Sequence, residues 1–178
     1  MTEKCFVDTN VLVYVYDPSS PTKTAIAMDW VDRLWKERTG RTSIQVLNEL
    51  YTVLTRKLKR VMPADNVWTD VQALLTWEPQ PINRELFLKA REIELRYRLS
   101  WWDSMIVAAA QLQECGILLT EDLQHGMKFD GVVVRNPFTF QVQDARAEYS
   151  ATVSIKPTPR HRRPGRPRKV RFAEVASK

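Results

Sequence analysis

Short apolar runs separated by amphipathic segments are the feature that most limits how this chain can fold. Residues 117–120 and 132–134 are such runs, apolar except for Thr120, as expected of strands covered on both faces. Residues 4–7 and 11–15 are also rich in strand-forming side chains. Helices alternating with such strands predict a three-layer α/β domain around a central, mainly parallel sheet.

Helix start signals divide the sequence between these runs. Ser20, which is followed by proline, is one, because Ser can cap a helix and Pro fits its first position. Pro63 opens another helical segment, and Ser43, Asn83 and Ser100 can cap three more. The chain therefore contains enough helices to cover both faces of the predicted sheet.

Four acidic residues stand where a solvated surface charge is not expected. Asp8 and Asp122 follow apolar runs, Glu49 shares a helical face with two valines, and Asp103 leads into the apolar segment 105–110. A carboxylate against apolar surface costs free energy unless it is paired or binds a cation. Active sites of parallel sheets lie at the carboxyl ends of the strands, where Asp8 and Asp122 are predicted. We therefore expect the fold to gather the four carboxylates.

Each acid alone has a simpler explanation, as a helix cap or a turn residue at a strand end. Asp103 could be only a charge favoured by the dipole at a helix N-terminus. Many other acids have a basic residue four positions later, as Asp29 has Arg33, and read as helix-surface pairs. The four acids lack such partners, and all four being unrelated turn residues is the less plausible interpretation.

Carboxylate ligands indicate Mg²⁺ or Mn²⁺, because both ions prefer oxygen donors. Such an ion lowers the pKa of a bound water and neutralises charge that develops on a phosphodiester. Other chemistries find little support in this chain. It has no Gly-x-Ser-x-Gly motif, five glycines without a phosphate-binding loop, and only two histidines and two cysteines.

The acidic residues fall within motifs that resemble, in order, those of PIN-domain nucleases, and most closely the VapC-type toxins of toxin–antitoxin pairs. The motifs are Val7-Asp8-Thr9-Asn10, Glu49, the segment 102–110 and Leu119-Thr120-Glu121-Asp122. The resemblance spans residues 3–140. It implies a PIN-like fold and a metal-dependent endoribonuclease, a hydrolase whose acidic cluster is Asp8, Glu49, Asp103 and Asp122. It also implies that Asn10 and Thr120 support the carboxylates and the water.

The same resemblance implies partners: an RNA substrate, an antitoxin protein that blocks the site, and a second copy of the chain in a homodimer. The N-terminus has no signal-peptide pattern, and no apolar stretch approaches the roughly 20 residues that span a bilayer. We therefore expect a cytoplasmic protein with no membrane partner.

The basic charge of the chain is concentrated at its C-terminus. Residues 151–178 hold nine Lys or Arg and one acid, whereas the preceding 150 residues hold eighteen basic and twenty acidic residues. The Pro-rich, basic composition of this part cannot build a core. We predict a PIN-like nuclease domain over residues 1–142 and a disordered tail over residues 143–178.

Part of the tail resembles an AT-hook, an extended Gly-Arg-Pro segment that fits the minor groove of A·T-rich DNA. The residues concerned are Arg162, Arg163, Gly165, Arg166, Pro167, Arg168 and Lys169. A simpler interpretation is a polycation that binds any nucleic acid. An alternative function is therefore a non-catalytic or DNA-directed nucleic-acid-binding protein whose tail dominates binding.

Overall fold

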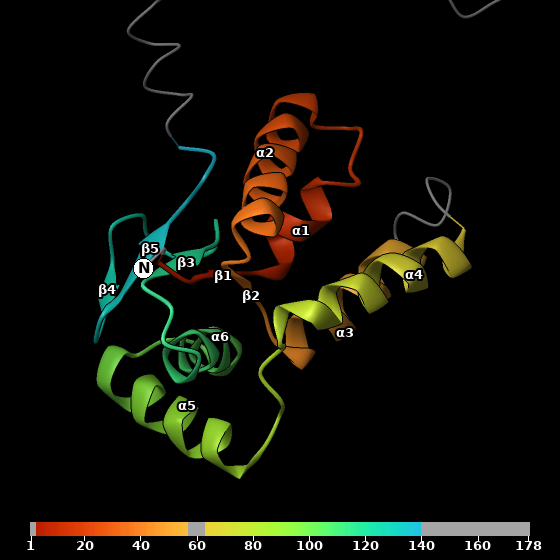
Figure 1. Ribbon diagram of the computed structural model, residues 1–178. Coiled ribbons are helices and arrows are strands. Elements are labelled where there is room, and N and C mark those ends of the chain that lie inside the picture. The colour runs from red at the N-terminus through yellow and green to blue at the C-terminus, as the bar shows by residue number, and fades with distance from the viewer. Residues whose placement is uncertain (1–2, 57–62, 140–178) are drawn as a thin grey trace, which may run out of the picture.

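The computed structural model describes residues 3–56 and 63–139, which fold around a five-stranded sheet (Figure 1). The strands are β1 (Cys5–Val7), β2 (Gly40–Arg41), β3 (Ile117–Leu119), β4 (Lys128–Phe129) and β5 (Val132–Arg135). Their order across the sheet is β2-β1-β3-β5-β4. All neighbours are parallel except β4 and β5. The predicted α/β class with a mainly parallel sheet is confirmed.

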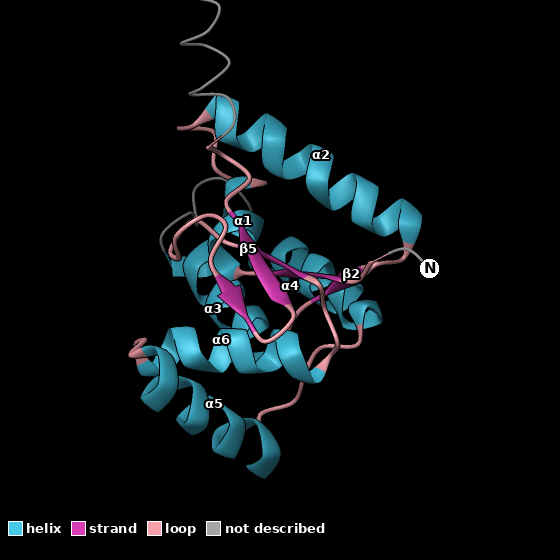
Figure 2. Ribbon diagram, turned by 90° about the vertical axis from the view of Figure 1, so that its left-hand side faces the viewer, coloured by secondary structure: helices cyan, strands magenta, loops and turns pink. Residues whose placement is uncertain are grey.

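Helices cover the sheet from two sides. They are α1 (Thr9–Tyr14), α2 (Pro21–Glu37), α3 (Ile44–Arg56), α4 (Ala64–Leu74), α5 (Arg84–Tyr97) and α6 (Trp101–Leu112), with the short 3₁₀ turn η1 (Leu75–Trp77) after α4. Figures 1 and 2 both show α1 and α2 on one side of the sheet and α5 and α6 on the other. The antiparallel pair α3 and α4 lies beside α1, which contacts α3. The result is the expected three layers.

The predicted helix caps are largely present. Ser43 Oγ accepts from Val46 N at 3.2 Å, and Asn83 Oδ1 accepts from Leu86 N at 2.9 Å. Ser100 Oγ caps α6 in the same way, whereas Ser20 makes no capping bond with its side chain. These short-range bonds satisfy backbone donors that the first helical turn leaves free.

The strand predicted at residues 11–15 is wrong, because the chain turns into α1 directly after β1. Asp8 adopts an extended conformation as the N-cap of α1, and its side chain accepts from Thr9 N. Val11 and Leu12 are then buried, where α1 packs on α3. A helix cap and tertiary packing here outweigh the strand preference of valines, which is a weak local signal.

Strand β5 is covered on one face rather than on both. Val132 and Val134 are buried, but Val133 between them is 37% exposed. Because successive side chains of a strand point to opposite faces, one face of β5 meets solvent at this position. The strand predicted from the continuous apolar run is present, but the prediction that both of its faces are buried is wrong. In contrast, Leu118 and Leu119 of the central strand β3 are fully buried.

Both cysteines, Cys5 and Cys115, are free and buried, as predicted. Burial raises the pKa of both thiols, that of Cys115 to about 12, so neither is a reactive thiolate near neutral pH. Within residues 3–56 and 63–139, no helix is long and apolar enough to cross a bilayer.

Candidate active site

Asp8 lies where β1 ends and α1 begins. Its Oδ1 atom accepts from Thr9 N at 2.7 Å, and its own backbone N–H donates to Leu119 O at 3.0 Å. The second bond joins the carboxyl ends of the parallel neighbours β1 and β3. The carboxylate is thereby fixed at the edge of the sheet where ligands usually bind, and the residue is only 8% exposed.

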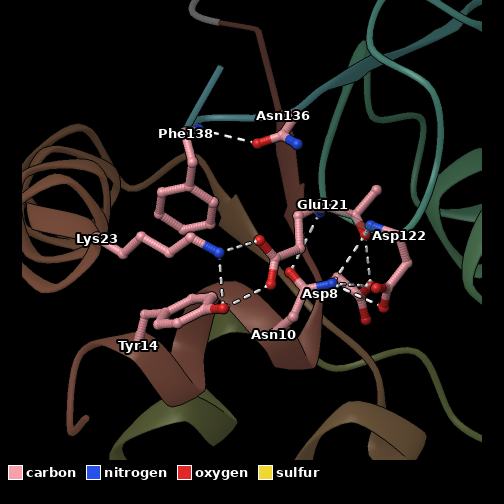
Figure 3. A network of polar contacts seen from close by, with 9 residues as sticks. Asp8, Asn10, Tyr14, Lys23, Glu121, Asp122, Asn136 and Phe138 are labelled. Carbon is pink, nitrogen blue, oxygen red and sulfur yellow. Dashed lines mark hydrogen bonds and ion pairs between the residues drawn. The ribbon is translucent and has the colours of Figure 1, made fainter. Parts of the chain in front are cut away.

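Asn10 connects Asp8 to the residues that follow β3. Its Nδ2 atom lies 3.2 Å from Asp8 Oδ2, 3.0 Å from Thr120 Oγ1 and 2.9 Å from Asp122 Oδ2. Thr120 Oγ1 in turn donates to Asp8 Oδ2 at 2.8 Å and accepts from Asp122 N at 3.1 Å. Figure 3 shows the Asn10 amide between the two carboxylates. The structure thus brings together four of the six residues identified from sequence.

Glu49 reaches the same region from α3. Its Oε2 atom accepts from Thr9 Oγ1 at 2.9 Å, and Oε1 accepts from Gln45 Nε2 at 3.2 Å. Because Thr9 also donates its backbone N–H to Asp8, one residue links the two acids. Glu49 is nevertheless exposed, as is Asp122. The expectation that both lie against apolar surface is wrong, because they stand at the open rim of the sheet edge.

Asp103 is in the first turn of α6. Its Oδ2 atom accepts from Ser100 Oγ at 2.7 Å, and its backbone N–H donates to the same Ser100 Oγ. No hydrogen bond joins it to Asp8, Glu49 or Asp122 among the described residues. Its side chain therefore bonds within the first turn of its own helix, to the N-cap residue Ser100.

The electrostatics of Asp8 show an excess of negative charge. The pKa of Asp8 is raised from 3.8 to about 6, mainly by burial and in smaller part by the charges of Asp122 and Glu49. Hydrogen bonds from Thr120 and Thr9 act in the opposite direction, because they stabilise the carboxylate. Asp122 and Glu49 are thus close enough to repel Asp8, and a bound cation would relieve that repulsion.

A comparison with protein-family models matches residues 5–126 to the PIN domain. The chain belongs to the PIN-domain family. The match includes all six residues named as the acidic site and its supports, and it confirms the family resemblance read from the motifs. A comparison with curated protein sequences gave no match.

Solved structures show the same fold. The PIN domain of this chain resembles the crystal structure of VapC20 from Mycobacterium tuberculosis, which is described as a sarcin-ricin loop cleaving toxin. The two share 20% sequence identity with a TM-score of 0.50, over 65% of this chain and 87% of VapC20.

The site of this PIN domain offers oxygen atoms, which are the ligands that hard divalent cations prefer. Carboxylate and hydroxyl oxygens from Asp8, Asp122 and Thr120 converge on Asn10 Nδ2, an amide with two hydrogens for three acceptors. In residues 3–56 and 63–139, however, no three Asp, Glu, His or Cys side chains are spaced to hold one ion. A cation would need the carboxylates to lie closer together than they do in this structure.

Three residues beside the site were not identified from the sequence. Lys23 Nζ lies 2.5 Å from Glu121 Oε2 and 2.7 Å from Tyr14 OH, and that hydroxyl donates to Glu121 Oε1 at 2.8 Å. The only signal available was that Glu121 lies between Thr120 and Asp122. The seven tail residues predicted to bind nucleic acid, Arg162 to Lys169, lie outside the described residues, as does the whole of 143–178.

Proposed function

We propose that this PIN-domain protein is a metal-dependent endoribonuclease that hydrolyses RNA phosphodiester bonds. The observation that carries the proposal is the acidic network at the carboxyl edge of the sheet. Asp8 and Asp122 share one hydrogen-bond donor there, and Asp8 has a raised pKa. Negative charge gathered in this way favours binding of a divalent cation.

Asp8, Asp103 and Asp122 would ligate Mg²⁺ or Mn²⁺ directly, with Glu49 as a ligand directly or through water. When bound, such an ion supplies an acidified water and neutralises charge on the phosphodiester. Thr120 holds Asp8 Oδ2 at 2.8 Å, which fixes the carboxylate against rotation. Asn10 holds Asp122 at 2.9 Å in the same way. Glu49 is oriented by Thr9 at 2.9 Å, so each of these acids has a neutral side-chain donor.

The assignment of RNA as substrate follows the family resemblance and the description of VapC20 as a toxin that cleaves the sarcin-ricin loop. On the same basis we propose that the chain is a cytoplasmic toxin of a VapBC-type system, acts as a homodimer and is blocked by an antitoxin. An Arg from the antitoxin would suit the site, because its planar guanidinium binds carboxylates through two parallel hydrogen bonds.

A cleavage assay on a structured, end-labelled RNA tests the activity. We expect cleavage with Mg²⁺ or Mn²⁺, no cleavage in EDTA, and recovery when the ion is restored. Asp122→Asn removes the charge of a proposed metal ligand and with it several kcal/mol of transition-state stabilisation. The cleavage rate should therefore fall by about 100-fold or more. Asp65→Asn is the control, since Asp65 is an exposed acid in the first turn of α4. Equal rates for wild type and Asp122→Asn would contradict the assignment.

The alternative function, binding of nucleic acid dominated by the tail, is supported by the charge of residues 151–178, which carry nine Lys or Arg. We propose that the tail adds affinity and that cleavage depends on the PIN domain. Deletion after Ser150 should weaken nucleic-acid binding and flatten its salt dependence, because fewer counterions are released. Cleavage at saturating RNA should persist. A full-length chain that binds nucleic acid without cleaving RNA, and loses that binding on deletion, would favour the alternative.

The sequence preference of the tail is tested separately by filter binding at physiological salt. An AT-hook-like tail should prefer A·T-rich over G·C-rich duplex DNA, because arginines are drawn to the narrow minor groove of A·T tracts. Arg166→Ala should remove that preference. Equal affinity for the two duplexes would make the tail a nonspecific polycation.

A further inference from the structure

The loop after β3 sends its side chains in two directions. Thr120 and Asp122 bond to Asp8 and Asn10 in the acidic site. Glu121, the residue between them, instead bonds to Lys23 and Tyr14. Figure 3 shows this second group on the far side of Glu121 from Asp8 and Asp122. The peptide that carries Asp122 is therefore held from two sides, and only one side belongs to the site already described.

Both carboxylate oxygens of Glu121 are used. Oε1 accepts from Tyr14 OH at 2.8 Å and Oε2 accepts from Lys23 Nζ at 2.5 Å. Lys23 Nζ also donates to Tyr14 OH at 2.7 Å, so the three groups form a closed triangle. A carboxylate held by a cation and a hydroxyl together has little freedom to rotate. The Glu121 side chain is 23% exposed, which limits competition from water.

Helix α1 supplies one contact to each side of the loop. Asn10 and Tyr14 lie four residues apart and therefore on one face of the helix. Asn10 binds Asp122 and also accepts from the backbone N–H of Glu121, at 3.4 Å, while Tyr14 binds the Glu121 side chain. Because Asn10 and Tyr14 are held one helical turn apart, they also hold the Asp122 and Glu121 side chains apart from each other.

Two aromatic rings enclose the ammonium group of Lys23. Its Nζ atom lies 4.3 Å from the ring centre of Tyr14 and 5.1 Å from that of Phe138. The two rings meet edge to face, with centres 5.0 Å apart. Ring faces attract a cation and exclude water from it, so this ion pair is better shielded than a pair on an open helix surface. The Lys36–Asp32 pair of α2 has the same 2.5 Å separation but is mostly exposed.

We propose that Lys23, Tyr14 and Glu121 form a positioning clamp that fixes the 120–122 loop and thereby sets where Asp122 stands relative to Asp8. The proposal rests on the function proposed above, because Asp122 is there a metal ligand. The clamp also neutralises Glu121, which would otherwise add a further negative charge beside the carboxylates of the site. Groups that orient metal ligands commonly change metal affinity or activity by about 10- to 100-fold when removed.

Three variants test the clamp, each compared with wild type. Lys23→Met keeps the aliphatic stem and removes the charge, and Tyr14→Phe removes only the hydroxyl. Lys23→Arg is a conservative variant that keeps the positive charge. Lys36→Met is the matched control, because it breaks an ion pair of the same length on the same helix. Thermal melts of each variant establish that it is folded.

The first measurement needs no activity. Amide hydrogen exchange of the peptide covering residues 117–123 should be about 10-fold faster in Lys23→Met than in wild type, because the loop loses its second anchor. Tyr14→Phe should show a smaller increase, and Lys23→Arg and Lys36→Met should exchange as wild type does. Unchanged exchange in a folded Lys23→Met protein would overturn the clamp even if the chain is a nuclease.

The second measurement connects the clamp to the metal. Titration of Mn²⁺ by electron paramagnetic resonance should give about 10-fold weaker binding in Lys23→Met, with a lower kcat for RNA cleavage and an unchanged KM. A raised KM with wild-type kcat and Mn²⁺ binding would make Lys23 a substrate contact and overturn the proposal. Faster loop exchange in a chain whose wild type neither binds Mn²⁺ nor cleaves RNA would leave the clamp standing and refute the proposed function.

Discussion

Asp8→Asn is expected to abolish RNA cleavage and at the same time to stabilise the metal-free fold. Activity is lost because the substitution removes a ligand charge without changing the side-chain volume. Stability rises because Asp8 is 8% exposed and its pKa is raised to about 6. The shift above the ordinary value of 3.8 amounts to about 3 kcal/mol of destabilisation when the group is ionised. Part of this gain is lost if the Asn side chain places an N–H donor against the amide of Asn10, which also donates there. We therefore expect a net gain in stability of about 1–3 kcal/mol.

The gain should depend on pH in a defined direction. The folded state binds the Asp8 proton more tightly than the unfolded state, so ionisation opposes folding. The wild-type protein in EDTA should therefore lose stability as pH rises from about 4 to above 6. Asp8→Asn should show its full gain at pH 8 and none below pH 4. Urea unfolding at both pH values measures this, and a variant that is less stable than wild type at pH 8 would contradict the raised pKa.

Asp103→Asn is expected to reduce cleavage by about 100-fold or more without the gain in stability. Asp103 is half-buried and accepts from Ser100 Oγ in the first turn of α6. The helix dipole stabilises a negative charge at that position. The neutral replacement should therefore lower the free energy of unfolding by about 0.3–1 kcal/mol. Cleavage assays and urea unfolding of the same preparations separate the two effects.

Asp65→Asn is the matched control for this second prediction. Asp65 also lies in the first turn of a helix, α4, and is exposed. It should lose a similar amount of stability and retain full activity. If Asp103→Asn keeps wild-type activity, Asp103 is only a helix-terminal charge, which is the simpler interpretation that the sequence left open.

The sequence predicted the parts of this molecule that local patterns determine. Ser43, Asn83 and Ser100 cap helices where expected, because a cap involves residues only three positions apart. Asp8 and Thr120 follow buried strands, and neighbouring parallel strands end at one edge of the sheet. That geometry brings them to 2.8 Å although 112 positions separate them.

Other features depended on tertiary contacts that no local pattern contains. The strand preference of residues 11–15 gave no sign of α1, since its packing on α3 decides the conformation. The valines near Glu49 indicated an apolar face, yet the carboxylate reaches the exposed rim and bonds to Thr9. The partners of Glu121 lie 98 and 107 positions away, so the sequence shows it only as another surface acid.

Iron-directed cleavage would show whether Asp8, Glu49, Asp103 and Asp122 hold one divalent cation. Fe²⁺ bound in place of Mg²⁺, with ascorbate and peroxide, cuts the backbone nearest the ion. We predict cuts near residues 8–10, 49, 103 and 120–122 of the wild-type chain, suppressed by excess Mg²⁺ and absent from Asp8→Asn. Cuts confined to other segments, or an intact chain, would mean that these four carboxylates do not bind the ion together.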